Sequence, residues 1–237
     1  VKVGGGAFMK DREPAERLAR LMVTIGERAG RRVHAVLSNM DQPLGRAVGN
    51  ALEVKEAIAA LQGRGPRDLD TLCRHEAAEL LLLAGKAGSP HEAHAAVNRA
   101  IESGTGLNKL AEVVAAQGGD RREVFEPERL PAAPVVALLT SPRTGYIARI
   151  DALTVGQAAV RLGAGRAAKS DPVRPDVGLV LQHKVGDHVR RGEPLLEVHA
   201  AGEPSATTAL CELARAFGFA ADPVEAVPVL LGGAGAA

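Results

Sequence analysis

Histidine and carboxylate side chains occur at two places in the chain with a spacing that suits metal binding on a helix. His91 and His94 lie three residues apart, but neither a cysteine nor a third histidine accompanies them, and a tetrahedral zinc site needs more ligands than this pair supplies. His75 is followed by Glu76, yet Glu79 stands where the zinc-protease pattern H-E-x-x-H requires its second histidine. Solvent-facing histidines are therefore the favoured interpretation.

A run of three glycines, Gly4-Gly5-Gly6, follows the short apolar stretch Val1 to Val3. Consecutive glycines can turn their N–H groups toward a phosphate, but this run has neither the Walker pattern nor the GxGxxG spacing. Because glycine adopts backbone angles that other residues avoid, the run is predicted to be a tight exit from a strand. The chain opens inside that strand without an initiator methionine, and we expect it to derive from a longer sequence.

A turn-rich phrase at residues 185–195 carries Gly186-Asp187 and Arg191-Gly192 turns in a β context. The phrase resembles the hammerhead or barrel-sandwich module of biotinyl and lipoyl domains. Those carriers use a lysine at a hairpin tip, typically flanked by methionine or alanine. Lys184 stands between His183 and Val185 and lacks that setting, so a carrier role is not favoured.

Composition argues against several classes of function. The net charge is +1, with 29 basic and 28 acidic residues dispersed along the chain, and aromatic residues make up 2%, which argues against a nucleic-acid partner. No apolar run approaches the length that spans a bilayer, so no membrane partner is expected. Cys73 and Cys211 are far apart in apolar segments and are predicted to be buried free thiols, as suits a reducing cytoplasm.

The first part of the chain is predicted to open with a strand–helix–strand unit and to continue as helices. Apolar residues recur at helical spacing from Pro14 to Arg28, and a partly β-branched run, Val33 to Leu37, follows. Such a unit implies parallel strands. Further helices are expected after Asn50, as a cap paired with Glu53, from Asp68 to Leu83, from Ser89 to Ser103 and from Leu107 to Gln117.

The second part is predicted to be richer in strands. Pro127, Pro131 and Pro134 mark a connector between the two parts. One short helix is expected at Val155 to Leu162, capped by Thr154. The expected strands are Val135 to Leu139, Tyr146 to Ile150, Val177 to Leu181 and Leu195 to Val198, followed by a helix at Ala209 to Phe217 and a frayed end at Gly232 to Ala237.

Four phrases stand out by their order and spacing: VKVGGGAFM at residues 1–9, DQPLGRAVGNALEV at 41–54, LGAGR at 162–166 and GDHV at 186–189. Together they resemble the pyrimidine-nucleoside and thymidine phosphorylases over nearly the whole chain. The resemblance implies an α/β fold, with a mixed sheet, flanking helices, a βαβ start and a helical middle, followed by a smaller α+β barrel-sandwich-like subdomain. It divides the chain into an α/β phosphorylase domain portion at residues 1–120, a connector at 121–134 and a hammerhead-like C-terminal subdomain at 135–237.

The activity that the resemblance implies is phosphorolysis. Inorganic phosphate would attack C1′ of uridine, thymidine or deoxyuridine and give the free base and a sugar 1-phosphate, in cytoplasmic pyrimidine salvage by a homodimer. The reaction needs a bound phosphate and cationic donors that stabilise the departing base. In the family these groups lie mostly upstream of the position that Val1 matches, so no catalytic residue is expected in this chain.

The resemblance also implies two sets of site residues. Phe8 would line the pocket around the pyrimidine 5-position, with a core phenylalanine as the alternative, and Lys2 is a candidate for an ion pair at the cleft edge. The backbone carbonyls of Leu44 and Ala47 and the carboxylate of Glu56 would bind a structural K+ or a loosely held Ca2+. The alternative for Glu56 is an exposed helix carboxylate. No organic cofactor is expected.

Two other functions stay open. A nucleotide phosphorylase or a phosphoribosyltransferase of related fold would share the architecture but would bind a sugar that carries a 5′-phosphate. A non-catalytic domain fragment is the third interpretation, since the expected charge-stabilising groups are not in this sequence. Extra cationic residues upstream would distinguish the two enzyme classes.

Overall fold

The structure is a computed structural model that describes residues 1–166 and 168–234. Its contacts group the chain into two compact units. The first contains Val1–Met40, Ala59–Val124 and the described residues from Val227 onward, and the second contains Asp41–Ile58 and Phe125–Ala226. Both units are mixtures of helices and strands, which confirms a mixed α/β fold. The domain boundaries expected around residues 121–134 stay a prediction, because each unit is assembled from separated stretches of sequence.

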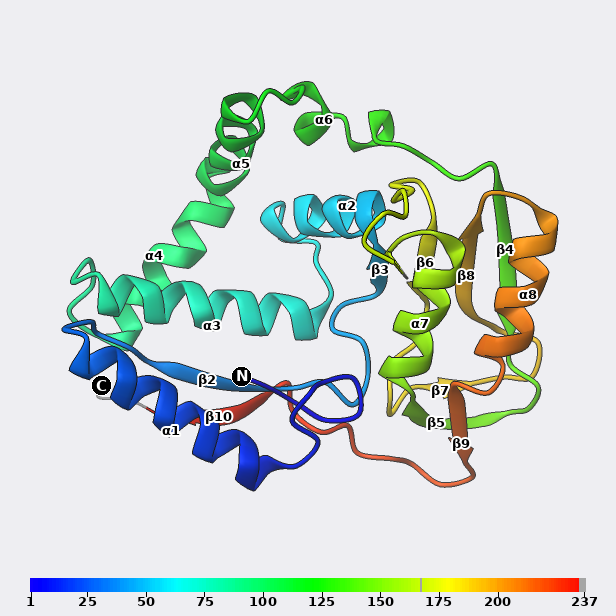
Figure 1. Ribbon diagram of the computed structural model, residues 1–237, viewed down its shortest axis with the longest axis horizontal. Coiled ribbons are helices and arrows are strands. Elements are labelled where there is room, and N and C mark those ends of the chain that lie inside the picture. Colours follow the sequence, from blue (N-terminus) through cyan, green and yellow to red (C-terminus); the bar gives the residue numbers. More distant parts are fainter. Residues whose placement is uncertain (167, 235–237) are drawn as a thin grey trace. The chain divides into compact units, whose positions relative to one another are not determined.

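The first unit opens with the predicted strand–helix–strand arrangement. β1 (Lys2–Val3) pairs in parallel with β2 (Ala35–Asn39), and α1 (Arg12–Arg28) connects them. In Figure 1 α1 lies along β2 and β10 (Leu230–Ala234), with which it makes contact. β10 is antiparallel to β2 and gives the strand order β1-β2-β10.

The strand β10 corrects the expectation of a frayed end for residues 232–234, while residues 235–237 lie outside the described part. Its pairing depends on small residues. A Cβ on Gly233 would lie 2.5 Å from the carbonyl oxygen of Ala35, so only glycine allows the two strands to come this close. A glycine-rich sequence therefore forms a strand here because its partner in the sheet requires it.

Alanines cover the inner face of α1. Ala15 and Ala19 are fully buried against Leu37, whereas the larger Leu21 and Ile25 are 56% and 58% exposed. The helix predicted from the apolar spacing is confirmed, and small residues rather than its largest apolar ones form most of its buried face. Small side chains let the helix approach the sheet closely, and this leaves an apolar row on its outer face.

Helices fill the middle of the chain, as predicted. Ser89 caps one of them by accepting a hydrogen bond from Glu92 N at 3.2 Å, and Glu92 Oε2 accepts one from Gly88 N at 2.8 Å. The helices are α2 (Asn50–Leu61), α3 (Arg67–Leu83), α4 (Pro90–Glu102), α5 (Thr105–Ala116) and α6 (Arg122–Phe125), followed by the 3-10 helix η1 (Pro127–Arg129).

The second unit contains two antiparallel sheets. The larger has the order β3-β6-β8-β4, formed by β3 (Ala47–Gly49), β6 (Gly178–Leu181), β8 (Pro194–Ala200) and β4 (Val135–Thr140). The smaller has the order β7-β5-β9, formed by β7 (His188–Val189), β5 (Gly145–Ile150) and β9 (Phe217–Ala220). Neither sheet closes on itself, so the unit is not a closed barrel.

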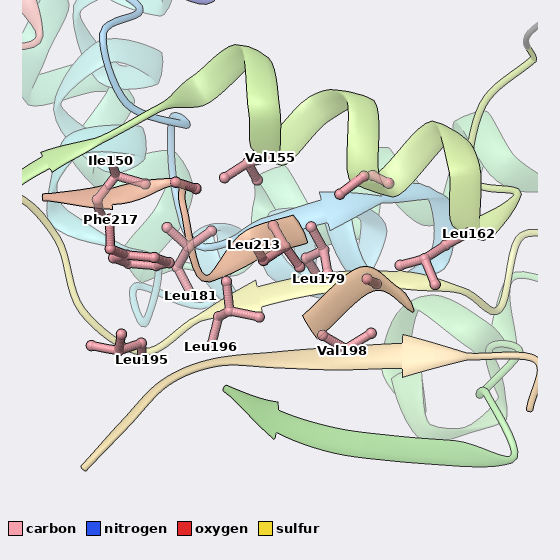
Figure 2. Close-up of a cluster of buried hydrophobic side chains, with 14 of the residues drawn as sticks. Ile150, Val155, Leu162, Leu179, Leu181, Leu195, Leu196, Val198, Leu213 and Phe217 are labelled. Carbon is pink, nitrogen blue, oxygen red and sulfur yellow. The ribbon is translucent and has the colours of Figure 1, made fainter. Parts of the chain in front are cut away.

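Two helices pack with these sheets around one apolar core. They are α7 (Ala152–Leu162) and α8 (Glu203–Leu213). The helix expected at Ala209 to Phe217 is wrong at its C-terminal end, because Phe217 pairs with Ile150 as the first residue of β9. Figure 2 shows side chains from α7, α8 and the strands meeting in this core, among them Ile150, Val155, Leu162, Leu179, Leu181, Leu195, Leu196, Val198, Leu213 and Phe217.

The start of α7 is capped by Asp151, and the prediction of Thr154 as the cap is wrong. Asp151 Oδ1 accepts a hydrogen bond from Thr154 N at 2.9 Å, and Oδ2 lies 2.8 Å from Arg149 Nη1. The hydrogen bond from the Thr154 backbone is the main cause that lowers the pKa of the Asp151 carboxyl group. The ionised form is therefore favoured in the folded chain.

Replacing Asp151 with alanine is expected to lower the free energy of unfolding by about 1 kcal/mol at neutral pH, because the helix loses its cap. Since folding lowers the pKa, the contribution is present above the unfolded value of about 3.9 and is lost as the pH falls through the folded value. Urea unfolding at pH 7 and pH 3 measures the difference. The exposed Asp222, changed to alanine, is the control, and an equal loss in both variants would contradict the cap.

Candidate functional site

The loop before β3 places polar backbone groups at an edge of the larger sheet. β3 is an end strand of that sheet, and Ala47 is paired with Val180 of β6. Arg46 O accepts a hydrogen bond from Leu181 N at 2.8 Å. In antiparallel pairing the N–H and C=O groups of the next residue point the other way. The backbone of Ala47 therefore faces away from β6, toward the open edge of the sheet.

Glu56 on α2 binds this loop through its carboxylate. Its Oε1 accepts hydrogen bonds from Arg46 N at 2.8 Å and from Ala47 N at 3.1 Å. Gly45 lies directly against the same carboxylate, since a Cβ at that position would be 2.2 Å from Glu56 Oε2. Hydrogen bonds from N–H groups to an ionised acceptor are among the stronger ones in proteins. The interpretation of Glu56 as an exposed helix carboxylate is therefore wrong, because the side chain is half-buried and holds the loop.

Lys184 reaches the same loop from the turn after β6. Its Nζ donates hydrogen bonds to the carbonyl oxygens of Pro43 and Gly45, the latter at 2.7 Å. Beside it, Val185 N donates to Gln42 Oε1 at 3.0 Å. The ammonium group is therefore used inside the second unit, which agrees with the expectation that Lys184 is not an exposed carrier lysine.

The predicted cation ligands can be compared with this arrangement. Ala47 and Glu56 lie together at the sheet edge, and the carbonyl groups on either side of Leu44 both point to the Lys184 ammonium group. Oxygen atoms around one negative charge suit a single monovalent cation. The carbonyl oxygens that Lys184 contacts are those of Pro43 and Gly45, which are not the predicted ligand atoms. The K+ or Ca2+ ligand set stays a prediction.

The glycine run near the start of the chain forms a turn. Gly4 N donates to Met9 O at 2.9 Å, Ala7 N donates to Gly4 O at 3.0 Å, and Gly6 N donates to Met40 O at 2.8 Å. These N–H groups are used within the chain, which supports the turn rather than a phosphate cradle. The turn presents Phe8 at its tip, with the side chain 100% exposed.

This exposure excludes one of the two interpretations of Phe8. It is not a core residue of this chain, so the core alternative is wrong. Lys2, in β1, is also exposed. The roles of Phe8 and Lys2 beside a substrate pocket stay predictions.

Two of the phrases that carry the resemblance meet in the second unit. Asn50, expected to cap α2, instead donates from Nδ2 to Ala164 O at 2.8 Å, and Ala51 N donates to Pro175 O at 3.0 Å. The start of α2 is instead capped by Glu53, whose Oε1 accepts a hydrogen bond from Gly49 N at 2.8 Å. A mainly apolar pocket of about 710 Å³ lies here between α2 and α7, lined also by Leu130, Pro131, Val160 and Gly165.

The histidines do not assemble a metal centre. Among the described residues no group of three or more histidine, cysteine, aspartate or glutamate side chains could hold a metal ion. The His75 and His94 rings are stacked with their centroids 6.5 Å apart, and His34 Nδ1 lies 2.5 Å from Glu79 Oε2. These contacts join neighbouring elements of the first unit, and His91 and His94 are both exposed, as predicted.

Both cysteines are exposed free thiols, so the prediction that they are buried is wrong. Partial desolvation of the thiol, together with the carboxylates of Glu76 and Asp70, raises the pKa of Cys73. A raised pKa lowers the thiolate fraction at neutral pH, which disfavours a nucleophilic role.

The sequence did not indicate Gln42 or Lys184 as partners of the loop. The DQPLG phrase carries the glutamine and the glycine of the turn, and Gly45 has φ +66°, a left-handed conformation that favours glycine. That glycine was a local signal of a special loop. No local signal connects it to Lys184, which lies about 140 positions later in the chain.

Comparison with known proteins supplies the family. A model of the glycosyl transferase family a/b domain matches residues 1–107, and a model of the pyrimidine nucleoside phosphorylase C-terminal domain matches residues 146–220. The chain is 47% identical over 200 residues to a pyrimidine-nucleoside phosphorylase of Geobacillus stearothermophilus, and 45% identical over 200 residues to that of Staphylococcus aureus RF122. Each alignment covers 84% of this chain and 46% of the relative, so the chain spans about half the length of the curated relatives it matches. The chain belongs to the pyrimidine-nucleoside phosphorylase family.

Proposed function

We propose that the full-length protein catalyses phosphorolysis of pyrimidine nucleosides. Uridine, thymidine or deoxyuridine would react with inorganic phosphate to give the free base and ribose or deoxyribose 1-phosphate, a pentosyl transfer in pyrimidine salvage. The observation that carries the proposal is the 47% identity over 200 residues to a protein of that name, together with the two matching family models.

In this proposal the chain supplies the scaffold of the active site, and the groups that bind phosphate and base belong to the rest of the protein. The described carboxylates with lowered pKa values support a structural role. The hydrogen bond from Thr154 lowers the pKa of Asp151, that from Arg174 lowers the pKa of Asp176, and the N–H of Arg190 lowers the pKa of Glu193. Asp151 caps a helix, Glu193 accepts an N–H within a turn, and Asp176 pairs with the Arg174 guanidinium. Phe8 and Lys2, both exposed, are proposed to meet the substrate at the pocket edge.

The second unit is proposed to be the hammerhead-like C-terminal module. Its support is the match of residues 146–220 to the C-terminal domain model and the pair of open antiparallel sheets around one core. In this module Lys184 uses its ammonium group within the fold, on the carbonyl oxygens of Pro43 and Gly45.

Assembly and location are proposed in the same way. A homodimer of the whole protein is supported by the apolar row on α1, where Leu21, Met22 and Ile25 are exposed. A cytoplasmic location is supported by the two unpaired cysteines. Among the described residues, no helix combines the length and the apolar character that crossing a membrane requires.

Phosphate-dependent base release is the test. The full-length protein is expected to release uracil or thymine with sugar 1-phosphate only when phosphate is present. The present chain alone is expected to be at least about 100-fold slower, since it lacks the groups that stabilise the developing charge. Base and sugar phosphate are quantified by chromatography.

The outcome for other substrates separates the alternatives. If the full-length protein yields sugar 1-phosphate from no pyrimidine nucleoside, the proposal fails. Turnover of nucleoside 5′-monophosphates alone would identify a nucleotide phosphorylase. A folded but inert full-length protein would leave only a non-catalytic domain.

A further inference from the structure

We propose that His34 and Glu79 form a polar clasp within the first unit, and that its release lets a helical part move away from a sheet part while each part keeps its own core. The sheet part consists of β1, α1, β2 and β10, and the helical part consists of α3 and α4. His34 Nδ1 lies 2.5 Å from Glu79 Oε2, although the two residues are 45 positions apart in the chain. The inference concerns a movement within the first unit and does not depend on the proposed activity.

The two parts have separate apolar cores. In the sheet part, Ala19 of α1 packs against Leu37 of β2. In the helical part, Ala78 of α3 packs against Val97 of α4. The two clusters share no member among the described residues, and the half-buried apolar residues around them also differ. Because burial of apolar surface stabilises each part by itself, a hydrogen bond between the parts can break without exposing either core.

The stretch before β2 holds the imidazole on the sheet part. A Cβ on Gly26 of α1 would lie 2.2 Å from Val33 Cγ2, so this stretch packs tightly on the helix. From β10, a Cβ on Gly233 would lie 3.5 Å from His34 Nε2. The ring is therefore positioned by α1 and β10, and its other nitrogen, Nδ1, is directed to Glu79 on α3.

Partial burial strengthens the hydrogen bond between the two side chains. Each side chain is 22% exposed, so both are largely removed from water. Nδ1 carries a proton in the charged imidazole and in one of the two neutral tautomers, and either form can donate to the carboxylate. Hydrogen bonds to an ionised acceptor are stronger than those between neutral groups. A carboxylate that loses its donor here is poorly solvated, so the hydrogen bond favours the closed arrangement.

The distance between two spin labels, measured by electron paramagnetic resonance, tests the proposal. The labels are attached at Thr24→Cys on α1 and at Glu102→Cys on α4, which are exposed positions on the two parts. The native thiols of Cys73 and Cys211 are exposed and are first replaced with serine. With the clasp intact, a single narrow distribution of distances is expected.

His34→Leu and Glu79→Leu each remove one partner of the clasp. Either variant is expected to raise the ratio of open to closed forms about 10-fold, which appears as a second population at longer distance. The double variant is expected to match the single ones, because the two partners act through one hydrogen bond. Glu76→Leu removes an exposed carboxylate from the same helix. It is the matched control and is expected to keep the narrow distribution.

Two results would overturn the proposal: a distribution that stays narrow in both His34→Leu and Glu79→Leu, or a control variant, Glu76→Leu, that opens as much as they do. If a leucine variant does not fold, as judged by circular dichroism, His34→Asn provides the second test. The asparagine amide can donate from near the position of Nδ1, so the narrow distribution is expected to persist. An open population in His34→Asn would show that packing of the imidazole ring, and not its hydrogen bond, joins the two parts.

Discussion

Replacing Gly178 with alanine is expected to lower the free energy of unfolding of the second unit by about 3 kcal/mol. Gly178 pairs with Gly49 across β3 and β6, and its φ is +153°. A Cβ there would lie 2.3 Å from Val48 O and 3.0 Å from Leu52 Cδ1. The carbonyl belongs to the backbone of a paired strand and cannot rotate away as a side chain can. The substitution must therefore separate the two strands or distort them.

Urea unfolding followed by circular dichroism measures this loss. Gly192 provides the matched control, because it also has a positive φ, +85°, in the same unit, but a Cβ there would meet no atom within 4 Å. Gly192→Ala is expected to lower the free energy of unfolding by only about 1 kcal/mol, which is the cost of a left-handed conformation for a residue with a Cβ. Equal losses in the two variants would mean that backbone angle alone matters at Gly178. The close approach of the two strands would then not contribute to the loss of stability.

The order of elements could be predicted from sequence because its signals are local. The cap at Ser89, the glycines that end helices and the period of the apolar residues all act within a few positions. The start of β9 shows where such signals fail. The apolar run from Ala209 to Phe217 continues with a helical period, but Phe217 pairs with Ile150 of a distant strand. The partner in the sheet, and not the local pattern, decides its conformation.

The inner face of α1 shows a second kind of failure. The spacing of apolar residues predicted the helix but not its buried face, which is formed by Ala15, Ala19 and Val23 while Leu21 and Ile25 are exposed. Hydrophobicity alone favours burying leucine and isoleucine, but close packing of a helix on a sheet also rewards small residues. The sequence contains both sets with the same period, so the choice depends on the surface that α1 meets.

The loop at residues 42–47 was recognised through resemblance, and only part of its chemistry was predicted. Glu56 does reach the loop, but through N–H groups that no residue pattern specifies. In the sequence Lys184 was considered only as a carrier lysine, a role that was not favoured. Its contact with Pro43 spans 141 positions of sequence. A contact over that distance is fixed by the pairing of β3 with β6, which has no signature in either strand. The charged side chains that bind the loop could therefore be identified only from the structure.

Leu181→Ala is the other substitution with a large expected effect, a loss of about 4 kcal/mol in the free energy of unfolding. Leu181 is fully buried in the core of the second unit. It is paired with Leu196 across β6 and β8, and Figure 2 shows its side chain between those of Leu196 and Phe217. Removing its branched end leaves a cavity that rigid strands cannot close. The cost therefore includes both the lost burial and the empty space.

The matched control is Leu138→Ala on β4, an end strand of the same sheet, where the leucine is 51% exposed. Both variants remove the same atoms from a strand, so a difference between their urea midpoints reports burial and packing. The control is expected to lose less than about 1 kcal/mol, because half of its side chain already contacts water. If both variants lost the same free energy of unfolding, the apolar core that contains Leu181 would not be the main source of stability in the second unit. A loss at Leu181 that also lowered the slope of the transition would instead indicate that the two sheets unfold separately.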